Sequence, residues 1–308
     1  MPLLLLLLVV LAGCGSPRSP ERTLTVFNAG SLARPMRAVL DTFARREGVT
    51  IAQESAGSLE SARKLTELGK IPDVIALADA DVFPQYLMPE FVATYTLFAR
   101  NRMVVAYTDR SRHADEMQTS TWTEILTRTD VEVGRSDPEL DPNGYRTLMV
   151  WQLAERARNE PGLATRLEGR AVARNVRPKE ADLVGLLEAG ELDYIWSYES
   201  MAKAIGFRYV LLGDSVDLSA PALADFYRGA SVSVRGAMTG SRVTFTGAPI
   251  VYAFAVPRNA PQPALAQRFA EFLVSTEGKA ILRREGLDAL DLPELITGTE
   301  RSGMLAVR

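Results

Sequence analysis

The sequence predicts an α/β protein of two domains built around parallel, doubly wound sheets. The chain has 308 residues, of which 47% are hydrophobic and 24% are charged, so it can form a substantial core. Strand-like and helix-like segments alternate along its first part, and the alternation restarts near residue 181 after a turn-rich stretch. At about 150 residues per domain, this length favours two domains.

The first domain begins with strand, turn and helix in repeated order. Short alternating segments read as strands, and segments with apolar residues three and four apart read as helices. In chain order these are strand 23–27, helix 32–47, strand 49–54, helix 59–68 and strand 73–77. Alternation at this spacing is typical of parallel strands joined by helices.

The same criteria predict the remaining elements. Gly190 ends the predicted helix 181–189. The predicted strands are 104–107, 131–134, 193–197, 209–212 and 250–256. The predicted helices are 122–126, 145–160, 181–189 and 264–284. The three tryptophans, Trp122, Trp151 and Trp196, are expected to pack in the core or between the domains, because no acidic or amide cluster accompanies them.

Charge and rare residues exclude several classes of function. Lys and Arg number 35 against 38 Asp and Glu, so the chain carries no basic field that could hold a nucleic acid. A single Cys and a single His exclude a disulfide, a Cys/His zinc site and a histidine-based catalytic triad. The glycine-rich phosphate-binding motifs of nucleotide-binding proteins are also missing.

The amino terminus reads as an export signal. Leu3 to Leu11 is an apolar run of nine residues, which is too short to span a bilayer and of the right length for a signal peptide. The following Leu11-Ala12-Gly13-Cys14 resembles the lipobox of bacterial lipoproteins, so residues 1–14 are expected to be a signal that ends at a lipidated Cys14. Residues 15–22 then form a tether. We expect an exported, membrane-anchored protein that faces the periplasm or the cell exterior.

Two identical turns suggest an anion site. The tetrapeptide Ala-Gly-Ser-Leu occurs at 29–32 and at 56–59, each time between a strand and a helix. Backbone N–H groups of Gly30 and Gly57, the hydroxyls of Ser31 and Ser58 and the positive ends of two helices would face one anion if the strands are neighbours. Taken singly, each serine could instead simply cap its helix.

An ordered set of motifs resembles the substrate-binding proteins of molybdate/tungstate ABC transporters, in the branch first known from archaea. The resemblance covers nearly the whole chain after the tether. The segments that carry it are Val26–Leu32, Ser55–Ser58, Pro72–Ala76, Asp141–Arg146, Gly190–Tyr194, Gly247–Tyr252 and Phe272–Ser275.

The resemblance implies a two-lobed periplasmic-binding-protein fold of type II, with a doubly wound mixed sheet in each lobe and the ligand in the cleft between them. Lobe I would comprise residues 23–107 and 208–308, and lobe II residues 108–207. It also implies capture of tungstate or molybdate by a monomer, delivery to an ABC permease and its ATPase, no enzymatic activity, and no cofactor.

The resemblance also assigns residues to the site. Ser31 and Ser58 match donors of the first lobe, Asp141 and Glu180 match carboxylates that approach the metal centre of the anion, and Tyr198 matches a tyrosine that lines the site. Asp182 competes with Glu180 for the second position. A Mo(VI) or W(VI) centre is a hard acid that accepts carboxylate oxygens, whereas the centres of sulfate and phosphate do not, so this pair would favour the right anion.

Other interpretations of the same residues remain open. Asp141 before Pro142 is a common turn opener, and Glu180 is a common first-turn residue of a helix. Tyr145 and Arg146 could contact the anion or its ligands, although an arginine at this position is more often at the surface or in a salt bridge. The chain could also bind sulfate or phosphate, or use Asp141 and Glu180 as acid and base of an exported glycoside hydrolase.

Overall fold

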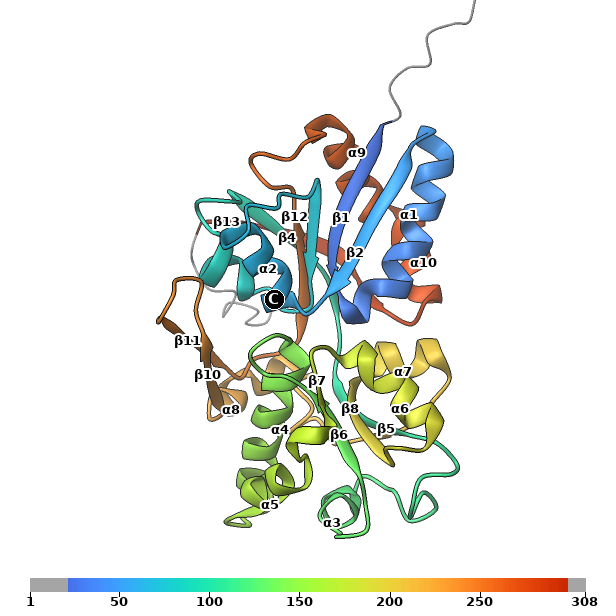
Figure 1. The fold of residues 1–308 in the computed structure, drawn as a ribbon, viewed down its shortest axis with the longest axis vertical. Coiled ribbons are helices and arrows are strands. Elements are labelled where there is room, and N and C mark those ends of the chain that lie inside the picture. The colour runs from blue at the N-terminus through green and yellow to red at the C-terminus, as the bar shows by residue number, and fades with distance from the viewer. Residues whose placement is uncertain (1–21, 299–308) are drawn as a thin grey trace, which may run out of the picture.

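The computed structural model describes residues 22–298 as two lobes, each with its own sheet (Figure 1). The expected signal peptide, Cys14 and most of the tether lie outside the described residues. Within the described part, no helix has the length and apolar character needed to cross a membrane. The predicted α/β class with two sheets is confirmed.

The first lobe contains a six-stranded sheet in the order β13-β4-β12-β3-β1-β2. Its strands are β1 (Thr23–Ala29), β2 (Thr50–Ala56), β3 (Val74–Leu77), β4 (Thr94–Arg100), β12 (Val251–Ala255) and β13 (Asp288–Thr297). Its helices are α1 (Ala33–Glu47), α2 (Ser58–Thr66), α9 (Pro263–Leu273) and α10 (Thr276–Arg284).

This sheet is mixed because its two ends are built differently. β1 runs parallel to β2 and to β3, as the strand–helix alternation predicts. The other three strands pair antiparallel, with β12 between β3 and β4 and with β13 at the edge. Phe43 of α1 packs edge-on against Phe269 of α9, with ring centroids 5.2 Å apart, and so joins these helices over the sheet.

The second lobe contains a five-stranded sheet in the order β7-β6-β8-β5-β9. Its strands are β5 (Met103–Tyr107), β6 (Val133–Ser136), β7 (Val176–Arg177), β8 (Tyr194–Tyr198) and β9 (Arg208–Leu211). Its helices are α3 (Trp122–Leu126), α4 (Pro142–Arg158), α5 (Leu163–Arg170), α6 (Val184–Ala189) and α7 (Glu199–Ile205). Trp196 packs edge-on against Trp122 and Trp151, at 5.7 and 5.9 Å, so the expected core role of the tryptophans is confirmed.

Three stretches of chain connect the lobes side by side. The Asn101 N–H donates to the Ile250 carbonyl at 3.3 Å, the Met103 N–H to Asp217 at 2.9 Å, and the Ile250 N–H to Leu218 at 2.8 Å. The return path carries the short helix α8 (Ala224–Tyr227) and a hairpin of β10 (Ser231–Arg235) and β11 (Arg242–Thr246). These stretches form the hinge between the lobes.

The strand pairings move two strands out of the lobe in which they were expected. β5 pairs with β8 and with β9, so the expected boundaries after residue 107 and before residue 208 are wrong by one strand each. The first crossing lies at Asn101–Arg102, ahead of β5. A fully buried apolar strand such as β5 carries no pattern that tells which of two sheets it joins.

Two helices also differ from the expected elements. The predicted helix 264–284 is two helices, because Ser275 starts α10 by accepting the Gly278 N–H at 3.1 Å. The helix predicted from 145 begins at Pro142, which occupies the first turn, where its missing N–H costs no hydrogen bond. This shift places Asp141 directly before the helix.

Candidate functional site

The twin Ala-Gly-Ser-Leu turns lie next to each other at one edge of the first sheet. β1 and β2 are parallel neighbours in register, with Ala29 opposite Ala56, so both turns leave the sheet at the same level. Neither serine caps its helix, since no side-chain cap bond is made at the start of α2 or of the 3-10 turn Gly30–Leu32. The simple capping interpretation of both serines is therefore wrong.

The two serine hydroxyls make other contacts. Ser58 is fully buried and its Oγ accepts the Ala78 N–H at 3.0 Å, which leaves its own hydrogen available to donate. Ser31 Oγ lies 2.8 Å from the hydroxyl of Tyr252 on β12. Both hydroxyls are thus held in place from the first lobe.

Asp141 and Glu180 meet in the second lobe. Asp141 caps α4 by accepting the Asn143 N–H at 3.3 Å, and its other oxygen accepts the Glu180 N–H at 2.8 Å. Glu180 Oε1 accepts the Ser197 hydroxyl at 2.5 Å and the Tyr198 N–H at 2.6 Å. The Glu180 Oε2 atom is buried and no described residue gives it a hydrogen bond. Asp141 therefore has the expected turn role as well, while Glu180 presents an unpaired acceptor.

Burial changes the protonation of both carboxyl groups. Removal from water raises the pKa of Asp141 to about 6, against the lowering effect of the N–H groups of Glu180 and Asn143. Removal from water raises the pKa of Glu180 to about 8, and the Asp141 charge adds to that rise. A buried carboxylate without a partner is unfavourable, so a bound proton or a neighbouring positive centre would stabilise this pair.

Tyr198 is tied to a buried ion pair between the lobes. Its hydroxyl accepts from Arg146 Nη1 at 2.8 Å, and the same nitrogen donates to the Ala78 carbonyl at 2.7 Å. Arg146 Nη2 lies 2.9 Å from Asp79 Oδ2, and the Tyr145 hydroxyl donates to that oxygen at 2.5 Å. Arg146 is thus the salt-bridged arginine that its position favours, and it is buried.

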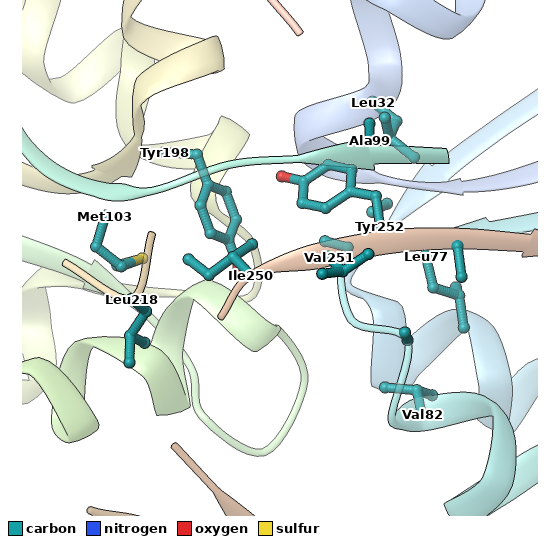
Figure 2. Packing of buried hydrophobic residues seen from close by; sticks show 14 of the residues in the cluster. Leu32, Leu77, Val82, Ala99, Met103, Tyr198, Leu218, Ile250, Val251 and Tyr252 are labelled. Atoms are coloured by element: carbon teal, nitrogen blue, oxygen red, sulfur yellow. The ribbon is translucent and has the colours of Figure 1, made fainter. Parts of the chain in front are cut away.

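Sequence reasoning missed Asp79, described above, and two further residues at the site. Tyr252 faces Tyr198 across the lobe boundary, with ring centroids 5.9 Å apart (Figure 2). Asn101 of the hinge donates to the Tyr252 hydroxyl at 3.0 Å and to Ser200 at 2.7 Å. A tyrosine within a buried apolar strand reads as core, so only its place in the Gly247–Tyr252 motif could have indicated it.

The lobes are in close contact around these residues. The Leu140 carbonyl of the second lobe accepts the N–H groups of Leu59 and Glu60 at the start of α2, at 3.2 and 3.3 Å. A Cβ atom added at Gly57 would lie 2.2 Å from that carbonyl oxygen. At Gly30 the nearest atoms to an added Cβ are those of Lys179 and Ala181, at 3.7 Å or more. Only the second of the twin turns therefore needs glycine for the lobes to touch.

Asp182 is placed away from the carboxyl pair. It is exposed and lies 3.7 Å from Lys179 Nζ at the rim, whereas Glu180 is buried beside Asp141. The geometry therefore favours Glu180 over Asp182 as the partner of Asp141.

Comparisons with known proteins identify the family of the chain. Residues 24–288 match the family described as bacterial extracellular solute-binding protein. A protein named "Uncharacterized solute-binding protein" from Petrotoga mobilis is 43% identical over 272 residues, which cover 88% of this chain and 85% of that protein. The molybdate/tungstate-binding protein WtpA of Pyrococcus abyssi is 36% identical over 321 residues, which cover 94% of this chain and 92% of WtpA.

Solved structures share the fold at low sequence identity. The sulfate-binding protein SubI from Mycobacterium tuberculosis H37Rv matches with a TM-score of 0.60 at 15% identity, covering 88% of each chain. The periplasmic molybdate-binding protein of Azotobacter vinelandii matches with a TM-score of 0.59 at 15% identity, covering 86% of this chain and 98% of that one. The expected type II periplasmic-binding-protein fold is confirmed.

Glu180 should make the ligand-free protein less stable as the pH rises. An unfolded glutamate has a pKa near 4.5 and folded Glu180 one of about 8, so folding favours its protonated form. That stabilisation is complete below the unfolded value and is lost as the pH rises through about 8. Thermal melts should show that the free energy of unfolding of the wild type falls on the order of 3 kcal/mol between pH 5 and pH 8.5. The Glu180→Gln variant should not show this fall.

The exposed Glu188 on α6 offers a matched control for this charge change. Glu188→Gln should keep the pH profile of the wild type. If Glu180→Gln and the wild type have parallel profiles, Glu180 is not the buried acid described above.

The contact at Gly57 predicts different effects of alanine in the twin turns. Gly57→Ala should weaken binding of tungstate, used as the probe anion, at least tenfold, because the new methyl group would meet the Leu140 carbonyl when the lobes close. Gly30→Ala should change the affinity less than threefold, because its Cβ has room. Calorimetric titration of both variants measures this difference. Equal affinities would show that closure does not require the observed approach.

Proposed function

Because the chain belongs to the bacterial extracellular solute-binding protein family, we propose that it captures molybdate or tungstate outside the cytoplasm and delivers it to an ABC importer. The name of the 36% identical WtpA protein supports this choice of anion. In this proposal the chain binds and releases its ligand without catalysing a reaction, and its partners are the permease and its ATPase.

One observation carries the choice of ligand. The buried Glu180 Oε2 has no hydrogen-bond partner among the described residues, and it belongs to a carboxyl group next to Asp141. A molybdenum or tungsten centre can accept both carboxylates as additional oxygen ligands. Ser31 and Ser58 would then donate to the oxygens of the anion from the other lobe.

Sulfate and phosphate fit this site less well. Their central atoms do not take up further oxygen ligands, so two carboxylates would only repel them in a cleft that excludes water. A glycoside hydrolase is also disfavoured, because the three tryptophans, which could otherwise stack on a sugar, pack against one another in the second lobe.

Membrane anchoring through Cys14 is a further part of the proposal. It rests on the sequence alone, where the apolar run Leu3–Leu11 leads into the lipobox-like Leu11–Cys14. A lipid on Cys14 would hold the two lobes near the permease by the tether 15–22.

Neutralising either carboxylate should reduce both affinity and discrimination. Asp141→Asn or Glu180→Gln removes a charged ligand of the metal centre, so tungstate affinity should fall by about 1.5–3 kcal/mol, roughly ten- to hundredfold. Sulfate rejection should weaken, because less negative charge repels it. Tungstate affinity of the wild type should also rise from pH 5.5 to pH 8.5, since ligated carboxylates must lose their protons. Calorimetric titrations with tungstate, molybdate, sulfate and phosphate measure these effects.

Asp182→Asn is the control within the same turn, because Asp182 is exposed and pairs with Lys179. It should leave tungstate affinity unchanged. Wild-type protein that binds sulfate or phosphate as tightly as tungstate would contradict the proposed function.

Lipidation is tested in the full-length chain. Cys14→Ala should release the protein from membranes and abolish incorporation of radiolabelled lipid, while tungstate affinity stays within twofold of the wild type. Ser16→Ala in the tether should remain anchored. A wild-type chain that takes up no label would contradict anchoring through Cys14.

A further inference from the structure

Arg146 is a buried cation that faces the candidate site from α4. Its side chain is 5% exposed, and it donates to the Tyr198 hydroxyl and the Ala78 carbonyl. Its charge lowers the pKa of Asp141 and opposes the rise of the pKa of Tyr252, so it acts on groups of both lobes at the site. A free cation at this position would attract any dianion that enters the cleft.

The Arg146 charge is balanced by a residue of the opposite lobe. Asp79 follows β3 in the first lobe and its Oδ2 atom lies 2.9 Å from Arg146 Nη2. The Tyr145 hydroxyl donates to the same oxygen at 2.5 Å and fixes the carboxylate in this position. Asp79 and Arg146 thus form an ion pair that is complete only when the lobes are together.

This arginine stays charged in the closed state. Burial alone would lower the pKa of its guanidinium, but the Asp79 carboxylate and the oxygens of Tyr198 and Tyr145 outweigh that effect and raise it. Arginine does not lose its proton in proteins, so removal of the Asp79 charge would leave a buried positive charge rather than a neutral side chain.

The neighbouring cation at the rim is also paired. Lys179 Nζ lies 3.7 Å from Asp182 and 3.3 Å from the Ser55 carbonyl. Among the described residues, the two cations beside Asp141 and Glu180, Arg146 and Lys179, thus each have an acidic partner. The Ser58 hydroxyl, in contrast, keeps its hydrogen available to donate to an anion.

We propose that Asp79 determines anion specificity by holding the Arg146 charge in an ion pair, so that the closed cleft has no free cation for sulfate or phosphate. This inference rests on the proposed capture of tungstate or molybdate. Those anions gain two carboxylate ligands at their metal centre and do not need the arginine. Sulfate and phosphate gain no such ligands, and without a cation they meet only the two carboxylates.

Asp79→Asn tests this role, since it removes the charge and keeps the shape of the side chain. Calorimetric titration at pH 7 should show sulfate affinity at least tenfold higher than in the wild type. The ratio of tungstate to sulfate affinity should fall at least tenfold. The double variant Asp79→Asn/Arg146→Gln should lose the gain in sulfate affinity, because the released charge is then absent.

Asp193→Asn is a matched control. Asp193 is also buried, accepts backbone N–H groups of Arg112 and Glu132 and pairs with Arg112 at 3.2 Å, but it lies directly before β8, at the end opposite Tyr198. It should keep the wild-type ratio of affinities. An Asp79→Asn protein that melts like this control and still rejects sulfate would overturn the role of Asp79.

If Asp79→Asn fails to fold, Arg146→Gln gives an independent test, because it removes the positive charge instead of leaving it unpaired. It leaves the Asp79 charge unpaired, so sulfate should remain unbound and tungstate affinity should fall at least tenfold. A gain of sulfate affinity in Arg146→Gln would contradict the inference. Failure of the wild type to bind tungstate would instead contradict the proposed function, so the two failures are distinguishable.

Discussion

The candidate site depends on two neighbouring carboxyl groups that are both buried away from water. Asp141 and Glu180 are held by backbone N–H groups and a serine, yet one oxygen of Glu180 receives no hydrogen bond from any residue between 22 and 298. Burial raises the pKa of both groups, even though the nearby Arg146 charge lowers that of Asp141. A protein that kept such a pair only for stability would do better with apolar side chains, so we interpret the pair as part of a ligand site.

The first lobe brings further polar groups toward the carboxyl pair of the second lobe. Parallel β1 and β2 bring Ser31 and Ser58 to one edge, and the missing side chain of Gly57 allows the Leu140 carbonyl to approach α2. Tyr198 and Tyr252 meet at the lobe boundary, beside the hinge residue Ile250 (Figure 2). Each lobe carries only part of these groups, so the proposed binding requires the two lobes to be together.

The sequence predicted the parts with local signals, and it missed those that depend on contacts between lobes. The repeated strand–turn–helix units predicted β1, α1, β2 and α2 closely, because turn chemistry and periodicity act over a few residues. The twin turns and the Asp141 motif likewise stood out locally. Asp79 and Tyr252 gave no such signal, since each matters through a partner more than 50 residues away. For the same reason the lobe boundary was misplaced at β5, whose sheet is decided by pairing with β8 and β9.

We propose that the two carboxylates bind the metal centre of the anion rather than only its oxygens. X-ray absorption at the tungsten edge, measured on the loaded protein at pH 8, distinguishes these two modes of binding. Carboxylate ligation should give an oxygen shell larger than that of free tungstate, with additional, longer tungsten–oxygen distances. A tetrahedral shell identical to that of the free anion would exclude carboxylate ligation, even if the protein binds tungstate tightly.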